Sequence, residues 1–166
     1  QRGEPMNKKL ILLVEDDPRD CELTCMALGK TGIDCQIDTV HDGAELVDYL
    51  FCTGSYQQRQ RRPQPHLILL DLKMPKLDGL QVLRMLRRAR SNDQDVPPPI
   101  VVLTSSDETD DIVQAYALGA NSYIRKPIDY ASFHTTIQQI AKYWLSVNEP
   151  PVQRDHAHAG GPQKKP

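Results

Sequence analysis

The stretch Leu10-Ile-Leu-Leu-Val-Glu-Asp-Asp17 decides the fold class, because a short apolar run stops abruptly at three acidic residues. Two similar apolar runs follow at Leu67–Leu70 and Ile100–Leu103. Strands that are apolar throughout need cover on both faces, as in parallel sheets that carry helices on each side. The three runs therefore predict the central strands of a parallel sheet.

Two further strands are predicted at Cys35–Val40 and Ser122–Arg125, and their polar or charged residues suit the edges of the sheet. Five helical stretches alternate with the five strands: Pro18 to about Lys30, Asp42–Thr53, Gly79–Arg90, Asp107–Leu118 and Asp129–Leu145. Alternating strands and helices predict an α/β fold with a doubly wound sheet. Right-handed crossovers favour the strand order 2-1-3-4-5, which resembles the flavodoxin-like (βα)5 fold.

The composition outside this pattern bounds the domain and its location. Residues 1–7 are predicted to be an N-terminal leader, 8–146 the domain, and 147–166 a flexible C-terminal tail rich in proline and glycine. The net charge of −2 gives no signal for nucleic acid or an anionic membrane, and no apolar run approaches the length of a membrane span. We expect a soluble, cytoplasmic protein that binds neither, with four free cysteine thiols.

Side chains that carry chemistry follow four of the predicted strands. Glu15, Asp16 and Asp17 follow the first and Asp71 the third, while Thr104 and Lys126 follow the fourth and fifth. Ligands of open parallel sheets bind at the carboxyl ends of the strands, so we expect these groups to meet. Clustered carboxylates repel one another, and Mg²⁺ relieves that repulsion.

The same set of groups suits phosphoryl transfer. Asp16 and Asp71 are the candidate carboxylate ligands of Mg²⁺, and an aspartate can also be the nucleophile. Phosphoryl transfer needs positioning and charge neutralisation more than covalent help. Lys126 supplies a positive charge and Thr104 a hydroxyl donor for that purpose.

Four blocks of the sequence resemble the signature segments of CheY-like response regulator receiver domains, and the resemblance covers roughly residues 8–146. The blocks are Ile11–Asp17, Leu69–Pro75 with Asp78-Gly79, Val102–Ser106 and Tyr123–Pro127. The resemblance implies a response regulator of a two-component phosphorelay, which accepts a phosphoryl group from a histidine kinase and signals by protein contact. It implies no enzyme activity beyond the domain's own Mg²⁺-dependent phosphorylation and dephosphorylation, and no cofactor besides Mg²⁺.

The resemblance also implies roles for individual residues of the metal site. Asp71 corresponds to the phosphoacceptor, Asp16 to a direct Mg²⁺ ligand, and Glu15 to the acid that holds metal-bound water. The main-chain carbonyl of Lys73 completes the metal shell. Two positions remain open for the Lys73 side chain: over the phosphoryl group, where it would slow hydrolysis, or in solvent.

Three further residues carry family roles outside the metal shell. Thr104 and Lys126 correspond to the pair that contacts the phosphoryl oxygens. Tyr123 corresponds to an aromatic switch that turns inward when Thr104 moves. In the family, the surface formed by the fourth helix, fifth strand and fifth helix is coupled to this switch. The resemblance therefore predicts a homodimer through that surface.

A narrower resemblance concerns the extra segment Thr53–Pro65 and the aromatic end of the last helix at Tyr143–Ser146. Both are similar to the small single-domain regulators that partner bacterial phytochrome histidine kinases, so a bacteriophytochrome is a candidate partner. An ordinary surface insertion remains the alternative.

Two other functions compete with this interpretation. A receiver-like module that binds partners without phosphorylation stays open as an alternative. A phosphatase of the haloacid dehalogenase type would need a second aspartate two residues after its nucleophile, where this chain has Lys73.

Overall fold

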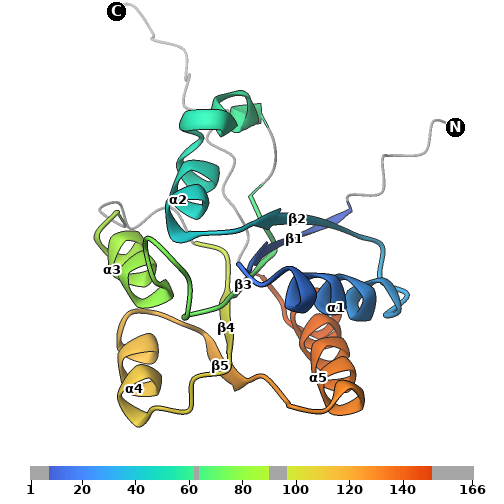
Figure 1. Cartoon of the computed structure of the whole chain (residues 1–166). Coiled ribbons are helices and arrows are strands. Elements are labelled where there is room, and N and C mark those ends of the chain that lie inside the picture. Colours follow the sequence, from blue (N-terminus) through green and yellow to red (C-terminus); the bar gives the residue numbers. More distant parts are fainter. Residues whose placement is uncertain (1–7, 62–63, 90–96, 151–166) are drawn as a thin grey trace, which may run out of the picture.

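The computed structural model describes residues 8–61, 64–89 and 97–150, and its centre is a five-stranded parallel sheet (Figure 1). The strands are β1 (Lys9–Val14), β2 (Cys35–Val40), β3 (Leu67–Leu70), β4 (Ile100–Thr104) and β5 (Ser122–Arg125). Their order, β2-β1-β3-β4-β5, confirms the predicted topology. The predicted leader and residues 151–166 of the predicted tail lie outside the described residues, so the predicted domain boundaries stay a prediction.

Helices cover both faces of the sheet (Figure 1). One face carries α1 (Pro18–Gly29) and α5 (Tyr130–Lys142), and the other carries α2 (Gly43–Phe51), α3 (Gly79–Ala89) and α4 (Thr109–Ala117). Alternate side chains of each central strand enter the two cores, because successive side chains of a strand point to opposite faces. In β1, Ile11 and Leu13 pack on the α1–α5 side, and Leu12 and Val14 on the other side. In the described part of the chain, no helix is long and apolar enough to cross a membrane.

The second helix ends earlier than its sequence predicts. Asp42 caps its start, where the carboxylate accepts a hydrogen bond from the Glu45 amide at 2.8 Å. The helix was predicted to run to Thr53 but stops at Phe51, because Cys52 adopts a left-handed backbone with φ of 55°. A residue in that conformation terminates an α-helix and turns the chain away from the helix axis.

The segment after α2 is anchored to the domain and is more than a surface loop. It forms a 3-10 helix, η1 (Gly54–Arg61), next to α2 in Figure 1. The Tyr56 ring packs edge-on against Tyr49 with centroids 5.2 Å apart. The Arg59 guanidinium lies 3.6 Å from the Tyr49 ring centroid and donates a hydrogen bond to the Tyr49 carbonyl at 3.2 Å. Residues 62–63 of the segment are outside the described residues.

Replacing Arg59 by alanine is expected to destabilise the domain by about 2 kcal/mol, because a desolvated cation–π contact and a buried hydrogen bond are lost together. Arg59 is only 5% exposed, so solvent does not replace these contacts. Urea denaturation measures the effect, with Gln58→Ala as a control, since Gln58 is exposed on the same 3-10 helix. Equal stability of the two variants would mean that η1 is not held by these contacts.

Candidate functional site

The backbone brings the ends of four strands to one side of the sheet: the central strands β1, β3 and β4 and the edge strand β5. The Asp71 amide continues the sheet ladder by donating to the Val14 carbonyl at 3.0 Å, which sets Asp71 beside the first acid after β1. The Lys126 amide in the same way donates to the Thr104 carbonyl at 2.8 Å. The carboxyl ends of these strands therefore present their polar side chains to a common space.

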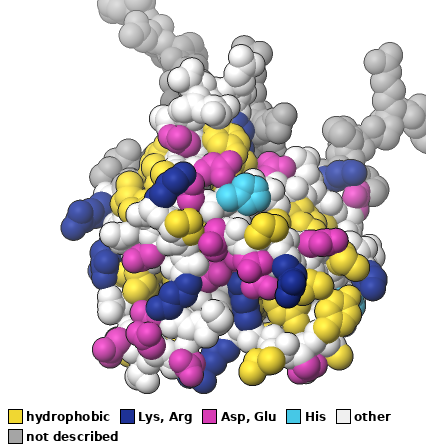
Figure 2. All heavy atoms as spheres, in the orientation of Figure 1, with side chains coloured by type: hydrophobic (Ala, Val, Ile, Leu, Met, Phe, Trp, Pro, Cys, Tyr) yellow, Lys and Arg dark blue, Asp and Glu magenta, His cyan; other side chains and the backbone are white. Residues whose placement is uncertain are grey.

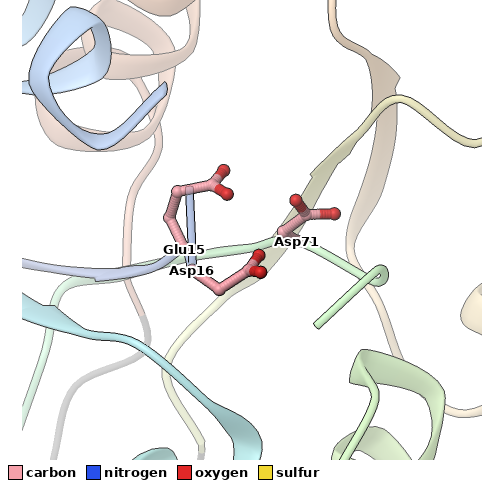
Figure 3. A group of neighbouring side chains, drawn as sticks. All are labelled: Glu15, Asp16 and Asp71. Carbon is pink, nitrogen blue, oxygen red and sulfur yellow. The ribbon is translucent and has the colours of Figure 1, made fainter. Parts of the chain in front are cut away.

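Three carboxylates converge there, from the ends of β1 and β3 (Figure 3). Glu15, Asp16 and Asp71 each offer an oxygen atom, and these oxygens all lie within 4.8 Å of one another. Glu15 and Asp71 are buried, at 3% and 6% exposure, whereas Asp16 is solvent-accessible. Acidic side chains also gather near the middle of the face in Figure 2. A set of carboxylate oxygens, partly open to water, fits the ligand preference of Mg²⁺.

Lys126 is the cation of this cluster. Its ammonium nitrogen donates hydrogen bonds to three carboxylates: Glu15 at 2.5 Å, Asp20 at 2.7 Å and Asp71 at 3.0 Å. Its side chain is only 9% exposed. Burial alone would lower the pKa of Lys126, but the charge of Asp71 and the bonds to the other two acids outweigh burial and raise it. The lysine therefore stays charged at neutral pH.

The pKa of Glu15 shows the effect of burying a carboxyl group close to another acid. Burial raises the pKa of its carboxyl to about 7, although the Lys126 ammonium pulls the pKa in the opposite direction. The charge of Asp71 adds to the rise. Both Glu15 oxygens are occupied, one by Lys126 at 2.5 Å and the other by the Asp17 amide at 3.1 Å. Added positive charge would relieve the remaining repulsion between the acids.

The loop after β3 fixes the Asp71 side chain. One carboxylate oxygen accepts a hydrogen bond from the Lys73 amide at 3.0 Å, and the other accepts from Lys126 at 3.0 Å. Gly79, the first residue of α3, lies so close behind that a Cβ atom there would sit 2.7 Å from the Asp71 carbonyl oxygen. Only glycine allows this approach without a shift of the backbone.

Thr104 and Tyr123 are joined through the loop after β4. Thr104 is fully buried, and its hydroxyl oxygen accepts a hydrogen bond from the Ser106 amide at 3.3 Å. The Tyr123 hydroxyl donates to the Ser106 carbonyl at 3.1 Å. The backbone of Ser106 therefore links Thr104 and Tyr123 by two hydrogen bonds.

The Lys73 side chain is exposed, which agrees with one of the two positions expected from the sequence, and it also has acidic partners that the sequence did not indicate. It is 52% exposed, but its ammonium pairs with Asp111 at 3.2 Å and Glu108 at 3.8 Å, at the start of α4. The hydrogen bond to Asp111 raises the pKa of Lys73. Asp111 also accepts a hydrogen bond from the Ser106 hydroxyl at 2.5 Å. Because these acids come from a distant helix, the sequence around Lys73 could not indicate them. The metal-ligand role of the Lys73 carbonyl stays a prediction.

Sequence reasoning missed Asp20, whose carboxylate lies 2.7 Å from the Lys126 ammonium. An acid in the first turn of α1 was visible in the sequence, but the helix dipole explains such an acid equally well. The pairing joins residues 106 positions apart, which no local pattern encodes.

Comparison with known proteins supplies a family. A family model for the response regulator receiver domain matches residues 11–138. The response regulator Rcp1 of Synechocystis sp. is 36% identical over 137 residues, covering 82% of this chain and 89% of Rcp1. Its Mn²⁺-bound crystal structure has a TM-score of 0.77 at 34% identity and covers 87% of this chain and 99% of that one.

Two further solved structures are similar. The phosphorylated cyanobacterial phytochrome response regulator RcpA has a TM-score of 0.78 at 35% identity, covering 87% of this chain and 99% of RcpA. The bacteriophytochrome response regulator AtBRR has a TM-score of 0.65 at 43% identity, covering 86% of this chain and 99% of AtBRR. The residues matched by the family model, 11–138, include the three acids of the cluster, Glu15, Asp16 and Asp71.

Proposed function

This chain belongs to the response regulator receiver domain family, a family of two-component signalling, and we propose that it accepts a phosphoryl group on Asp71 from a histidine kinase. In this proposal Mg²⁺ is held at the neighbouring carboxylates, and the signal passes on by protein contact in the cytoplasm. The observation that carries the proposal is the buried Asp71 carboxylate, 3.0 Å from the Lys126 ammonium and within one cluster with Glu15 and Asp16.

The proposed transfer is a substitution at phosphorus. An Asp71 oxygen attacks the phosphorus atom of the kinase phosphohistidine, a P–O bond forms, the P–N bond breaks, and the electron pair of that bond leaves with the imidazole nitrogen. Lys126 pairs with a phosphoryl oxygen, and the Thr104 hydroxyl donates a hydrogen bond to another. The Lys73 amide, 3.0 Å from one Asp71 oxygen, holds the carboxylate in a single orientation.

The acids of the cluster divide the metal site between them in this proposal. A bound Mg²⁺ would neutralise charge on the phosphoryl oxygens. Asp16 and Asp71 would hold it directly, together with the main-chain carbonyl of Lys73. Glu15, which is buried and accepts hydrogen bonds from Lys126 and the Asp17 amide, would act through metal-bound water, the role that the family resemblance implies. The Mn²⁺-bound structure of Rcp1 supports a divalent site in a relative with the same fold.

The switch proposed for the output joins Thr104 to Tyr123. On phosphorylation the Thr104 hydroxyl turns to the phosphoryl group, the loop around Ser106 shifts, and the Tyr123 hydroxyl loses its present acceptor. The hydrogen bonds from the Ser106 amide to Thr104 and from Tyr123 to the Ser106 carbonyl support this path. The phosphoryl group at Thr104 and a partner at Tyr123 would then favour the same one of two conformations of this loop. Such a shared two-state element is what coupling between two sites requires.

The kinase proposed as partner is a bacteriophytochrome. RcpA and AtBRR are phytochrome response regulators by their descriptions, and this chain is 35% and 43% identical to them. Two features of this chain resemble that group of regulators: the anchored segment at η1, beside α2, and the aromatic end of the last helix at Tyr143–Ser146.

A small phosphodonor tests the proposed function without knowledge of the kinase. Incubation of the whole chain with acetyl phosphate and Mg²⁺ should add the mass of one phosphoryl group to the peptide that contains Asp71, and a chelator should prevent it. An unchanged mass under conditions that label a known receiver domain would favour the alternative, a receiver-like module that binds partners without phosphorylation.

A homodimer through α4, β5 and α5 is also proposed. β5 is an edge strand of the sheet. On α4, Val113 and Tyr116 are 61% and 50% exposed, and Tyr143 after α5 is 51% exposed. Trp144, at the same aromatic end, is partly buried and packs against the core.

We expect Val113→Asp to shift the chain from dimer to monomer, because a charge replaces an apolar contact at the proposed interface. Sedimentation velocity at micromolar concentration measures the shift, with Met26→Asp as the control, since Met26 is 45% exposed on α1. A wild-type chain that sediments only as a monomer, with and without phosphodonor, would refute the dimer.

A further inference from the structure

Asp20 carries no role in the proposed function, yet it accepts one of the three hydrogen bonds of the Lys126 ammonium. We propose that Asp20 is a positioning residue, which fixes the Lys126 ammonium beside Asp71 and so supports phosphoryl transfer. This inference rests on the proposed function, because Lys126 matters here only as the partner of the phosphoryl group.

The geometry at the nitrogen atom supports this role. A lysine ammonium has three protons to donate, and the three acceptors are Glu15 at 2.5 Å, Asp20 at 2.7 Å and Asp71 at 3.0 Å. Every proton therefore has a partner, and the nitrogen is held at one point. Removal of Asp20 would leave one N–H group of the Lys126 ammonium without an acceptor. The flexible lysine side chain could then move away from its position beside Asp71.

Asp20 differs from the other two acceptors in its relation to the metal. The carboxylate cluster that could hold a cation consists of Glu15, Asp16 and Asp71. A cation there would compete with Lys126 for the oxygens of Glu15 and Asp71. Asp20 is outside that cluster, so its bond to Lys126 does not depend on the metal. It is the acceptor that can keep Lys126 in place in both states.

Asp20 is itself held by a rigid element. Its amide donates to the Asp17 carboxylate at 3.1 Å, in the cap of α1, and α1 packs against α5. Lys126 lies on the connection between β5 and α5, 106 residues further along the chain. The Asp20 contact therefore connects that segment to α1 beside the carboxylate cluster, where the Asp20 side chain is 33% exposed.

The first test compares rates of labelling by acetyl phosphate at saturating Mg²⁺. Asp20→Asn should slow labelling about tenfold, the size of a lost hydrogen bond between charged groups. Asp20→Glu keeps the carboxylate and should restore part of the rate. Glu22→Gln, an exposed change on the same helix, should leave the rate unaltered.

The Mg²⁺ affinity of Asp20→Asn should fall less than that of Asp16→Asn, and a larger fall would make Asp20 a metal ligand and overturn the inference.

A double-mutant cycle separates positioning from a general structural role. In a Lys126→Met background, Asp20→Asn should cause no further loss, because its effect acts through the missing ammonium. A second, additive loss in that background would overturn the inference, since it would mean that Asp20 acts through the fold.

A metal-free readout completes the experiment. In wild-type protein the buried Lys126 ammonium should give an observable NMR signal, because its protons are bonded and exchange slowly with water. The signal should broaden or vanish in Asp20→Asn and persist in Glu22→Gln. An unchanged signal together with an unchanged labelling rate in Asp20→Asn overturns the inference alone. Failure of the wild-type chain to take up label overturns the proposed function and the inference with it.

Discussion

The Asp71→Asn variant is expected to take up no phosphoryl group while it keeps the fold. An amide is not a nucleophile comparable to a carboxylate, so the P–O bond cannot form. The structure around the cluster should remain intact, because Lys126 keeps Glu15 and Asp20 as acceptors at 2.5 and 2.7 Å. Removal of one acid also relieves the repulsion that, with burial, raises the pKa of Glu15 to about 7. Phosphate incorporation and thermal unfolding measure the two parts of this expectation.

The control for Asp71→Asn is Asp110→Asn, the same chemical change at an exposed position on α4. That variant should be labelled like the wild type. Labelling of Asp71→Asn at a rate near wild type would place the acceptor at another residue. Loss of the fold in Asp71→Asn would show that the Lys126–Asp71 contact is required for the stability of the domain.

The Asp16→Asn variant is expected to lose Mg²⁺ affinity by a larger factor than Glu15→Gln. Loss of a partner that acts through water costs roughly 10- to 100-fold in metal affinity, and a direct carboxylate ligand costs more. The positions of the two acids agree with this order. Asp16 is open to solvent, whereas Glu15 is 3% exposed and bonded to Lys126 and to the Asp17 amide.

Mg²⁺ titration by calorimetry measures both affinities, and the labelling rate with acetyl phosphate should fall in parallel. Equal losses, or a larger loss in Glu15→Gln, would contradict the proposed division between a direct ligand and an acid that acts through water. A loss of labelling at unchanged Mg²⁺ affinity would mean that these acids position the phosphodonor instead.

The sequence by itself determined the sheet and the place of the site. The apolar runs at Leu10–Val14, Leu67–Leu70 and Ile100–Leu103 became the central strands, because only a sheet covered on both faces buries them. The polar runs became its edges. Since ligands of such sheets bind at the carboxyl ends of the strands, the acids after β1 and β3 were expected to meet, and they do. These features follow from the order of apolar and polar residues along the chain, which does not depend on contacts between distant residues.

The tertiary structure alone decided the partners of the charged side chains. Lys73 pairs with Asp111 on α4, Lys126 with Asp20 on α1, and Arg59 packs on Tyr49 of α2. Long flexible side chains take whichever opposite charge or aromatic face the packed elements bring within a few ångströms. Periodicity along the chain sets which face of a helix is buried, but it contains no information on which distant residue will lie opposite. For this reason the acids at the strand ends could be identified from the sequence. Asp20 on α1, which accepts a hydrogen bond from Lys126, could not.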